Sequence, residues 1–310
     1  MGLNLFIEQI LNGIQFGVTL FLMSAGLTLI FGVMGLINLA HGSLYMIGAF
    51  AAALVLSWTG SFFTALIASF AVACFFGVLI EIIIIRRLYY RNHLDQVLAT
   101  FALILLLSEG TRWFFGPFPM FLDLPGFLSG TILLPGGIVY SKYRLAIIII
   151  GLLISVSLFA LISKTRFGIQ IRAGENDREM ISALGINIVK LNTIVFGLGA
   201  ALAGLSGALI GAIQSVEVGM GEPILILAFV VIVIGGIGSI KGAFLGALLV
   251  GVTDTLGRVV LPMFFMMFLS PSSAISIGSS LSSMLIYVLM AIILVVKPQG
   301  LFGIKRYSNA

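Results

Sequence analysis

Long apolar runs recur along the whole chain, and they constrain its fold more than any other feature. A helix needs about 20 apolar residues to cross a bilayer core, and only helices or closed barrels satisfy the backbone there. These runs are too long for barrel strands, so the sequence predicts an all-α, polytopic bundle of about eight to nine spans in one transmembrane domain over residues 1–310. The expected spans are 8–34, 42–58, 61–85, 96–114, 144–163, 191–213, 223–240, 242–260 and 277–296.

Composition supports a membrane protein. Hydrophobic residues make up 60% of the chain and charged residues only 9%, whereas soluble domains carry roughly 25% charged residues. The first apolar run has no basic segment before it and is longer than a signal-peptide core, so we expect it to remain as a span. Cys74 is the single cysteine and lies in an apolar run. It predicts a packed small side chain, no intrachain disulfide and no cysteine metal cluster.

Basic residues indicate the orientation in the membrane. If loops alternate sides, twelve of the sixteen basic residues share one side, which the positive-inside rule makes cytoplasmic. The N-terminus is then outside and the C-terminus cytoplasmic. The twelve are Arg86, Arg87, Arg91, Lys164, Arg166, Arg172, Arg178, Lys190, Lys241, Lys297, Lys305 and Arg306, and the other four are Arg112, Lys142, Arg144 and Arg258.

Two further patterns concern packing. The outer loop 115–143 contains four prolines and several glycines, which predicts an irregular external cap. Small residues recur four apart in the later spans, a spacing that lets helix backbones approach closely in lipid. These pairs are Ala200 with Gly204, Gly207 with Gly211, Gly242 with Gly246, and Ala247 with Gly251.

The loop 164–190 carries eight of the 27 charged residues and must project into water. Asn176 is the expected N-cap of a helix of about eight residues, roughly 12 Å long, which Gly185 ends. Its apolar stripe consists of Met180, Ile181 and Leu184. A helix this short is marginal alone, so either a partner protein or the chain's own helices should cover that stripe. Asn187 is the expected cap of the next span.

Five segments with a shared order and spacing point to a known family. They are GVMGLINLAHGSLYMIGAF (32–50), TRFGIQIRAGENDREMISALGIN (165–187), GLGAALAGLSGAL (197–209), GGIGSIKGAFLGALLVG (235–251) and KPQGLFG (297–303). Together they resemble the membrane subunits of bacterial branched-chain amino-acid ABC importers, the high-affinity leucine, isoleucine and valine type. The resemblance covers nearly the whole chain. It implies an inner-membrane permease that works with ABC ATPase subunits, a second related permease subunit and an extracytoplasmic solute-binding protein.

The resemblance also assigns a role to the polar loop, which would dock in a cleft of the ATPase subunit. By position, the docking residues are Arg172, Ala173, Glu175, Asn176, Asp177, Ala183, Leu184 and Gly185. The chain contains no Gly-Lys dipeptide and therefore no phosphate-binding P-loop. We expect a transport subunit that is not an enzyme and leaves ATP hydrolysis to its partner.

The segment INLAHGSLYMIGAF (37–50) places neutral polar side chains where a membrane helix should begin. We interpret it as an interrupted helix that faces the translocation path, with GGIGSIKG (235–242) as its counterpart. Uncharged amides, hydroxyls and helix ends suit a zwitterionic amino acid. The alternative is that His41 bonds a carbonyl and the glycines only permit close packing. The candidate path residues are Asn38, His41, Gly42, Ser43, Gly236, Gly238 and Ser239.

Two other classes of protein are weaker alternatives. An ion-coupled transporter or channel for a small polar solute usually needs unpaired acids in the membrane. Here Glu81 has Arg86 and Arg87 nearby, Glu109 has Arg112, and Asp254 has Arg258. A membrane enzyme would need a catalytic cluster, but the two histidines, His41 and His93, form no metal-binding motif. The sequence predicts no catalytic residues, no metal site, no cofactor and no nucleic-acid partner.

Overall fold

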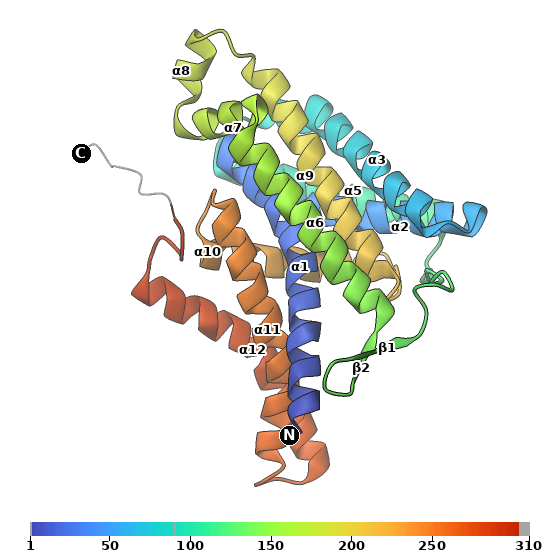
Figure 1. Ribbon diagram of the computed structural model, residues 1–310. Coiled ribbons are helices and arrows are strands. Elements are labelled where there is room, and N and C mark those ends of the chain that lie inside the picture. Colours follow the sequence, from blue (N-terminus) through green and yellow to red (C-terminus); the bar gives the residue numbers. More distant parts are fainter. Residues whose placement is uncertain (1, 90, 304–310) are drawn as a thin grey trace.

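The computed structural model describes residues 2–89 and 91–303, which form a helical bundle with one small hairpin (Figure 1). Eight of its helices are long and apolar enough to cross a membrane, which confirms the predicted fold class. The helices are α1 (Leu3–Met34), α2 (His41–Thr59), α3 (Phe62–Ile80), α4 (Arg86–Leu88), α5 (His93–Phe115), α6 (Lys142–Lys164), α7 (Arg166–Asn176), α8 (Arg178–Ala183), α9 (Ile188–Gly211), α10 (Gly221–Gly235), α11 (Ile240–Phe265) and α12 (Pro271–Val296); a π-helical turn, Glu81–Ile85, joins α3 to α4.

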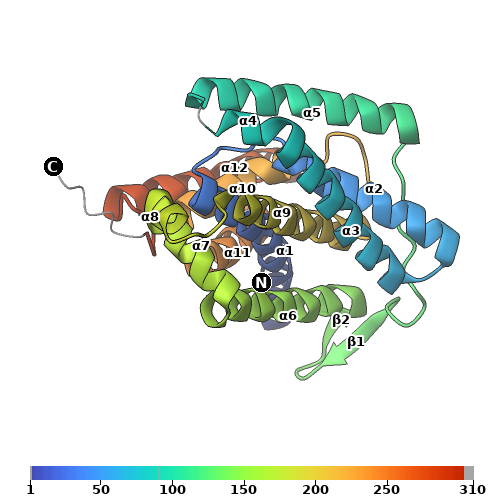
Figure 2. The same ribbon diagram turned by 90° about the horizontal axis from the view of Figure 1, so that it is seen from above.

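Helices α1 and α9 form the centre of the bundle. Seen from above, they lie between α5 on one side and α6 on the other (Figure 2). The apolar windows of α1 and α9 are 83% buried, whereas those of α5 and α12 are 22% and 11% buried. Helix α12 has a mean hydropathy of 2.4, against 2.0 for α1 and α9, so its exposed face suits contact with lipid chains; α5 is less apolar, at 1.4.

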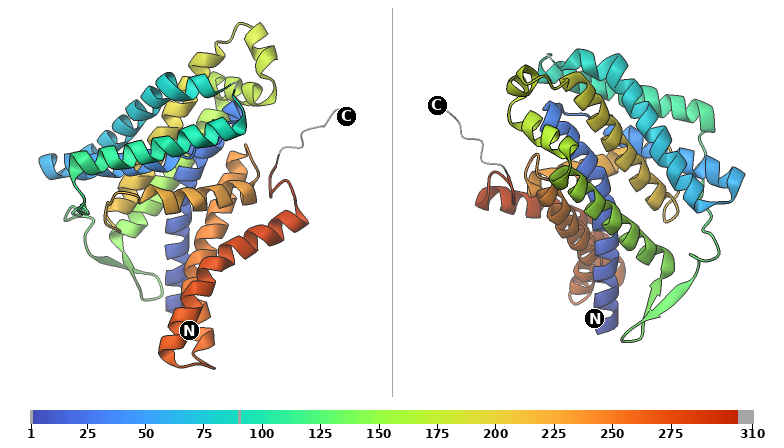
Figure 3. Two further views of the ribbon diagram at one scale, coloured as in Figure 1. Left: turned by 180° about the vertical axis from the view of Figure 1, so that it is seen from behind. Right: turned by 45° about the horizontal axis from the view of Figure 1, so that its top comes forward.

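The bundle has two distinct ends. Helices α7 and α8 project from one end, and the N-terminus and the hairpin of β1 (Thr131–Leu134) and β2 (Ile138–Ser141) lie toward the other (Figure 3). We call these the α7–α8 end and the hairpin end. The hairpin is antiparallel, with Thr131 opposite Ser141. The prediction of an irregular cap over 115–143 is therefore wrong for this part, where alternating residues pair across a tight glycine turn.

Glycines allow the central helices to cross closely. A Cβ on Gly17 of α1 would lie 2.8 Å from the Ala247 carbonyl oxygen of α11, and one on Gly246 would lie 2.8 Å from the Val231 carbonyl oxygen of α10. A Cβ on Gly204 would meet α3 at the Ser69 carbonyl oxygen, 3.0 Å away. Small residues in these helices therefore pack against neighbouring backbones, as their spacing predicts.

The seventh expected span, 223–240, is wrong in both length and boundaries. Helix α10 has only 15 residues, about 22 Å of helix, and ends at Gly235. Gly236 and Gly238 adopt φ values of +99° and +82°, which end the helix and form a turn. Ser239 then caps α11 by accepting a hydrogen bond from the Gly242 N–H at 3.1 Å. Residues 236–239 thus form a turn between two separate helices, α10 and α11.

The ends of the last two helices also differ from the sequence prediction. Helix α11 continues through Pro262 to Phe265 rather than ending at 260. Helix α12 begins at Pro271 rather than at 277, because a proline fits the first turn of a helix, where its missing N–H is not needed.

The polar loop contains two helices rather than one. Helix α7 continues to Asn176, so Asn176 is not the N-cap of the next helix, and that prediction is wrong. Asp177 has extended φ and ψ and caps α8, because its Oδ1 accepts the Met180 N–H at 2.9 Å. Gly185 ends the segment with φ +86°. Asn187 caps α9 through the Lys190 N–H at 3.0 Å, as predicted.

Candidate functional site

A short non-helical connection separates α1 from α2 inside the bundle. Helix α1 ends at Gly35, whose φ of +60° and N–H bond to the Phe31 carbonyl form the C-cap. Residues 35–40 are not helical, and α2 begins at His41. The predicted interruption is confirmed as a feature of the backbone.

Helix α2 begins deep within the protein. Asn38 and His41 are both 0% exposed. The His41 imidazole lies against the backbone of Met23, which is eleven residues before the end of α1, or about 16 Å along that helix. The structural alternative, in which His41 bonds a carbonyl, is not met, because within the described ranges neither ring nitrogen of His41 has a hydrogen-bond partner. The Asn38 Oδ1 accepts the Ala40 N–H at 3.1 Å and so supports the bend before α2.

Helix α10 starts at the same place. A Cβ on Gly42 would lie 2.6 Å from the Gly221 carbonyl oxygen, so the first turns of α2 and α10 touch through two glycines. The positive ends of both helix dipoles therefore lie close together within the bundle. Broken helices that meet in this way form the substrate sites of other transporters.

Buried polar atoms accompany this junction. At this junction, Asn38 Nδ2, both ring nitrogens of His41 and the Tyr45 hydroxyl have no hydrogen-bond partner among the described residues. All three side chains are almost fully buried. An unsatisfied polar group buried in a membrane protein costs free energy, so these groups are the polar atoms of the junction that are available to a further hydrogen-bond partner.

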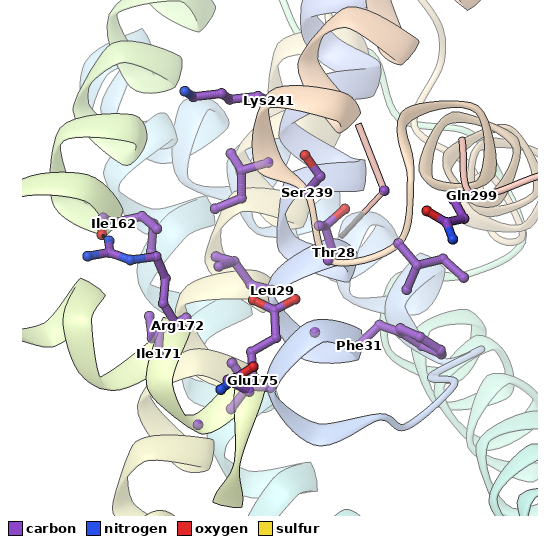
Figure 4. Close-up of a pocket in the computed structure, with 18 of the residues that line it drawn as sticks. Thr28, Leu29, Phe31, Ile162, Ile171, Arg172, Glu175, Ser239, Lys241 and Gln299 are labelled. Carbon is purple, nitrogen blue, oxygen red and sulfur yellow. Dashed lines mark hydrogen bonds between the residues drawn. The ribbon is translucent and has the colours of Figure 1, made fainter. Parts of the chain in front are cut away.

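A large cavity opens at the α7–α8 end (Figure 4). Its volume is about 1630 Å³, and its wall includes α1, α6, α7, the turn 236–239 and the tail after α12. Thr28 lies in its wall, together with Glu175, Ser239 and Gln299. On the α6 side, Lys241 Nζ lies 5.3 Å from the centre of the Phe159 ring.

The structure divides the predicted path residues into two groups. Gly238 and Ser239 line the cavity, whereas Asn38, His41 and Gly42 are buried at the α2–α10 junction, outside the cavity wall. Ser43 and Gly236 are also absent from that wall among the described residues. The set does not share one open cavity in this structure.

Most of the predicted docking residues are exposed on α7, α8 and the loop after α8. The exposed ones are Arg172, Asn176, Asp177, Ala183, Leu184 and Gly185, whereas Ala173 and Glu175 are partly buried. The apolar stripe of α8 is divided in the same way. Ile181 is 3% exposed and packs on the chain itself, but Met180 is 60% exposed and Leu184 is 73% exposed.

Three acids of the apolar spans, Glu81, Glu109 and Asp254, are each paired with an arginine, as expected. Arg112 Nη1 lies 2.8 Å from Glu109 Oε1, and Arg258 Nε lies 2.9 Å from Asp254 Oδ2. Glu81 is 0% exposed and lies in the π-helical turn. Acids paired in this way offer little support for an ion-coupled mechanism.

Glu81 has three different donors. Arg86 Nη2 and the Thr193 hydroxyl donate to Oε2 at 2.9 and 2.8 Å, and the Tyr89 hydroxyl donates to Oε1 at 2.6 Å. Burial, followed by the hydrogen bond with Glu81, raises the pKa of Tyr89. This network joins the end of α3 to the first turns of α9, shortly after the polar loop.

The tail after α12 is a contact that sequence reasoning did not identify. The Leu301 and Phe302 N–H groups donate to the carbonyls of Ile234 and Gly235 at 2.8 and 2.9 Å. These carbonyls belong to the last turn of α10, which has no further helical donors. The motif KPQGLFG carried the signal, because its two glycines permit a close backbone contact.

Comparison with known proteins identifies the family. The family model for the permease component of branched-chain amino acid transport systems matches residues 9–294. The high-affinity branched-chain amino acid transport permease BraD of Pseudomonas aeruginosa is 30% identical over 312 residues, 96% of each chain. LivH of Escherichia coli K12 is 27% identical over 318 residues, 96% of each chain. The probable LivH of Methanocaldococcus jannaschii is 29% identical over 263 residues, 80% of each chain. The chain therefore belongs to this permease family and is a membrane-spanning permease subunit.

Proposed function

We propose that the chain is the permease subunit of an ABC importer that moves branched-chain or similar small amino acids across the bacterial inner membrane. The observation that carries this proposal is the family match over residues 9–294. The relatives that share 96% of their length with the chain are named for the same transport system. The ATPase subunits, a second related permease and an extracytoplasmic binding protein complete the importer.

The substrate path runs from the α2–α10 junction to the cavity at the α7–α8 end. Asn38, His41, Gly42 and Ser43 form its closed section. Gly236, Gly238 and Ser239 belong to the turn at its exit. Two helix N-termini and buried neutral polar groups support this assignment, because they can stabilise a zwitterion without holding it tightly.

The exposed part of α7, α8 and the following loop docks on the ATPase. Exposed Leu184 and Met180 support this role, because the free energy of the system falls when a partner covers an apolar side chain that was in water. The charge distribution supports cytoplasmic placement of this end. Of the larger basic group, Lys164, Arg166, Arg172 and Arg178 lie in or directly beside α7 and α8, and Lys190 lies in the first turn of α9; Lys305 and Arg306 lie outside the described residues.

A reconstitution experiment tests the function. The chain is copurified with the proteins encoded beside it, placed in lipid vesicles with ATP inside or outside, and assayed for uptake over a panel of amino acids, urea and short amides. We expect ATP-dependent uptake of leucine, isoleucine or valine. Uptake of none of the panel, or uptake of a non-amino-acid only, would contradict the proposed substrate class.

A further inference from the structure

The turn 236–239 between α10 and α11 contacts two parts of the chain through two different glycines. Gly238 lies against Glu175 of α7, and Gly236 lies against the tail 299–303. The turn also forms part of the wall of the large cavity. A segment in this position can change the shape of the cavity when either neighbour moves.

The Glu175 contact depends on the absence of two side chains. A Cβ on Gly238 would overlap Glu175 Oε1, and a Cβ on Gly32 of α1 would lie 3.0 Å from the same oxygen. That Gly32 Cβ would also lie 3.5 Å from the Gly238 Cα, so α1, the turn and the carboxylate meet at one point. Figure 4 shows the Glu175 carboxylate extending from α7 into the cavity.

The tail holds the other side of the turn. A Cβ on Gly236 would lie 2.5 Å from the Gly303 N, and one on Gly300 would lie 2.5 Å from the Gly236 N. Together with the bonds of Leu301 and Phe302 to the end of α10, these contacts tie the first half of the turn to the tail. Of the contacts described here, those at the second half of the turn, at Gly238, are with Glu175 and Gly32.

Helix α7 leads directly into the exposed segment proposed to dock on the ATPase. Asn176 ends α7 and the next residue, Asp177, caps α8. A displacement of α8 therefore reaches Glu175 through less than one helical turn. Because the carboxylate is in van der Waals contact with the turn, α7 cannot move toward the cavity without displacing the turn.

We propose that Glu175 is a positioning residue that transmits movement of α7 and α8 to the turn 236–239, and that this turn is the gate of the cavity. The inference rests on the proposed function, because it takes the docking segment as the source of movement. It departs from the assignment of Glu175 to the docking surface itself, since the side chain extends inward rather than toward a partner.

Four variants of the assembled importer test the contact: Glu175→Ala, Gly238→Ala, the double variant, and Gly116→Ala as control. Gly116 has φ +86°, close to that of Gly238, but its added Cβ would meet nothing within 4 Å, so it reports backbone strain alone. We expect the amount of copurified ATPase to stay at the wild-type level in every variant. The amount of amino acid taken up per ATP hydrolysed should fall about tenfold in each of the two single variants, Glu175→Ala and Gly238→Ala, which is within the usual range of coupling between two sites.

The double variant separates contact from coincidence. If Glu175 and Gly238 act through one contact, removing the carboxylate makes room for the methyl group that Gly238→Ala adds, and the double variant should transport no worse than either single. Multiplied losses in the double variant would overturn the proposal. Loss of the ATPase from Glu175→Ala would also overturn it, because Glu175 would then be a docking residue.

A crosslink gives a second measurement, in which Glu175→Cys also removes the carboxylate that a Cβ at Gly238 would overlap. Glu175→Cys and Gly238→Cys are combined with Cys74→Ala, which removes the single native cysteine. Oxidation should abolish uptake, and a reductant should restore it, with the ATPase bound throughout. Unchanged uptake by the crosslinked protein would refute the gate. A wild-type importer that takes up no amino acid in the same vesicles would instead refute the proposed function.

Discussion

Glu81 shows how a charged side chain is accommodated inside the bundle. Its carboxylate is fully buried and receives hydrogen bonds from Arg86, Tyr89 and Thr193. The π-helical turn brings Arg86 back toward the acid, with which it pairs at 2.9 Å. A buried carboxylate that loses its cationic partner still carries the free-energy cost of leaving water, but no longer has the attraction that offset it. Its ion pair therefore matters more for stability than that of a surface acid.

We predict that Arg86→Met lowers the free energy of unfolding by about 3 kcal/mol, the cost of leaving a buried charge unpaired. The matched control is Arg112→Met, which breaks the exposed pair with Glu109 and should cost less than about 1 kcal/mol. The measurement is the denaturation midpoint of each protein in the same detergent. Equal losses for the two variants would show that Glu81 is not specially dependent on Arg86.

Asn38 and His41 should matter for transport rather than for assembly. We predict that the double variant Asn38→Leu, His41→Leu abolishes uptake, because the α2–α10 junction loses the polar groups that would meet a zwitterion. Copurification of the ATPase and its basal activity should be unchanged. Thr100→Val, which alters a buried polar residue of α5, is the control and should retain uptake. Normal uptake by the double variant would exclude this part of the proposed path.

Tyr140 should make the stability of the hairpin end depend on pH. Burial raises its pKa to about 12, and among the described residues its hydroxyl has no hydrogen-bond partner. Since the unfolded pKa is about 10, the neutral hydroxyl stabilises the fold below about pH 10, and this contribution is lost as pH rises toward about 12. Tyr140→Phe should therefore lose less stability between about pH 9 and about pH 11 than the wild type, measured by denaturation midpoint. An identical loss of stability in Tyr140→Phe and the wild type would show that ionisation of Tyr140 does not cause the pH dependence.

At the scale of helices, α8 has one face packed on the chain and another face exposed. Ile181 is buried against the chain, whereas Leu184 and Asp177 are exposed near the ends of the segment. The Asp177 side chain caps the helix, and Asn187 fixes the start of α9. We expect a movement of α8 to reach α9, because α9 begins five residues after α8 ends.

Replacing Asp177 and Leu184 by alanine should weaken ATPase docking. Leu184 loses its exposed apolar surface, and Asp177 loses both its charge and its capping bond, worth about 1 kcal/mol of helix stability. We expect the amount of copurified ATPase to fall at least about tenfold, since hot-spot residues cost about 2 kcal/mol or more. Ser182→Ala, on the same helix and exposed, is the control. An undiminished yield with both residues changed would place the docking surface elsewhere.

Hydropathy and capping residues predicted most helices because bilayer thickness and backbone bonding leave few alternatives. Asn187 and Gly185 were identifiable from local chemistry alone. Asn176 was assigned the wrong role, because Asp177 beside it is an equally good cap and only the packing of α7 selects between them. The length of α10 was overestimated, since an apolar run does not show that Gly236 and Gly238 adopt positive φ values and end the helix at Gly235.

The candidate site was less predictable than the fold. Sequence patterns brought out the neutral polar segment 37–50 and the glycines near 236, but not their separation between a buried junction and a cavity. The inward direction of Glu175 also depends on tertiary packing. Its only sequence signal is the pair of glycines, Gly32 and Gly238, and these lie far apart along the chain.

For the whole molecule, the arrangement is a central pair of helices, an apolar perimeter and a polar segment at one end. Two broken helices meet inside, and a cavity opens toward the polar segment. We expect such a chain to depend on an external source of free energy, since its sequence contains no phosphate-binding P-loop and Glu81, Glu109 and Asp254 of its apolar spans are paired with arginines.

The most direct test of this account compares two energy sources in vesicles. The chain is reconstituted either alone or with its ATPase and companion subunits, and amino-acid accumulation is measured with ATP or with an ion gradient. We predict accumulation only with the full assembly and ATP, and it should persist after an uncoupler dissipates all gradients. Accumulation by the isolated chain with an ion gradient and no ATP would contradict the account.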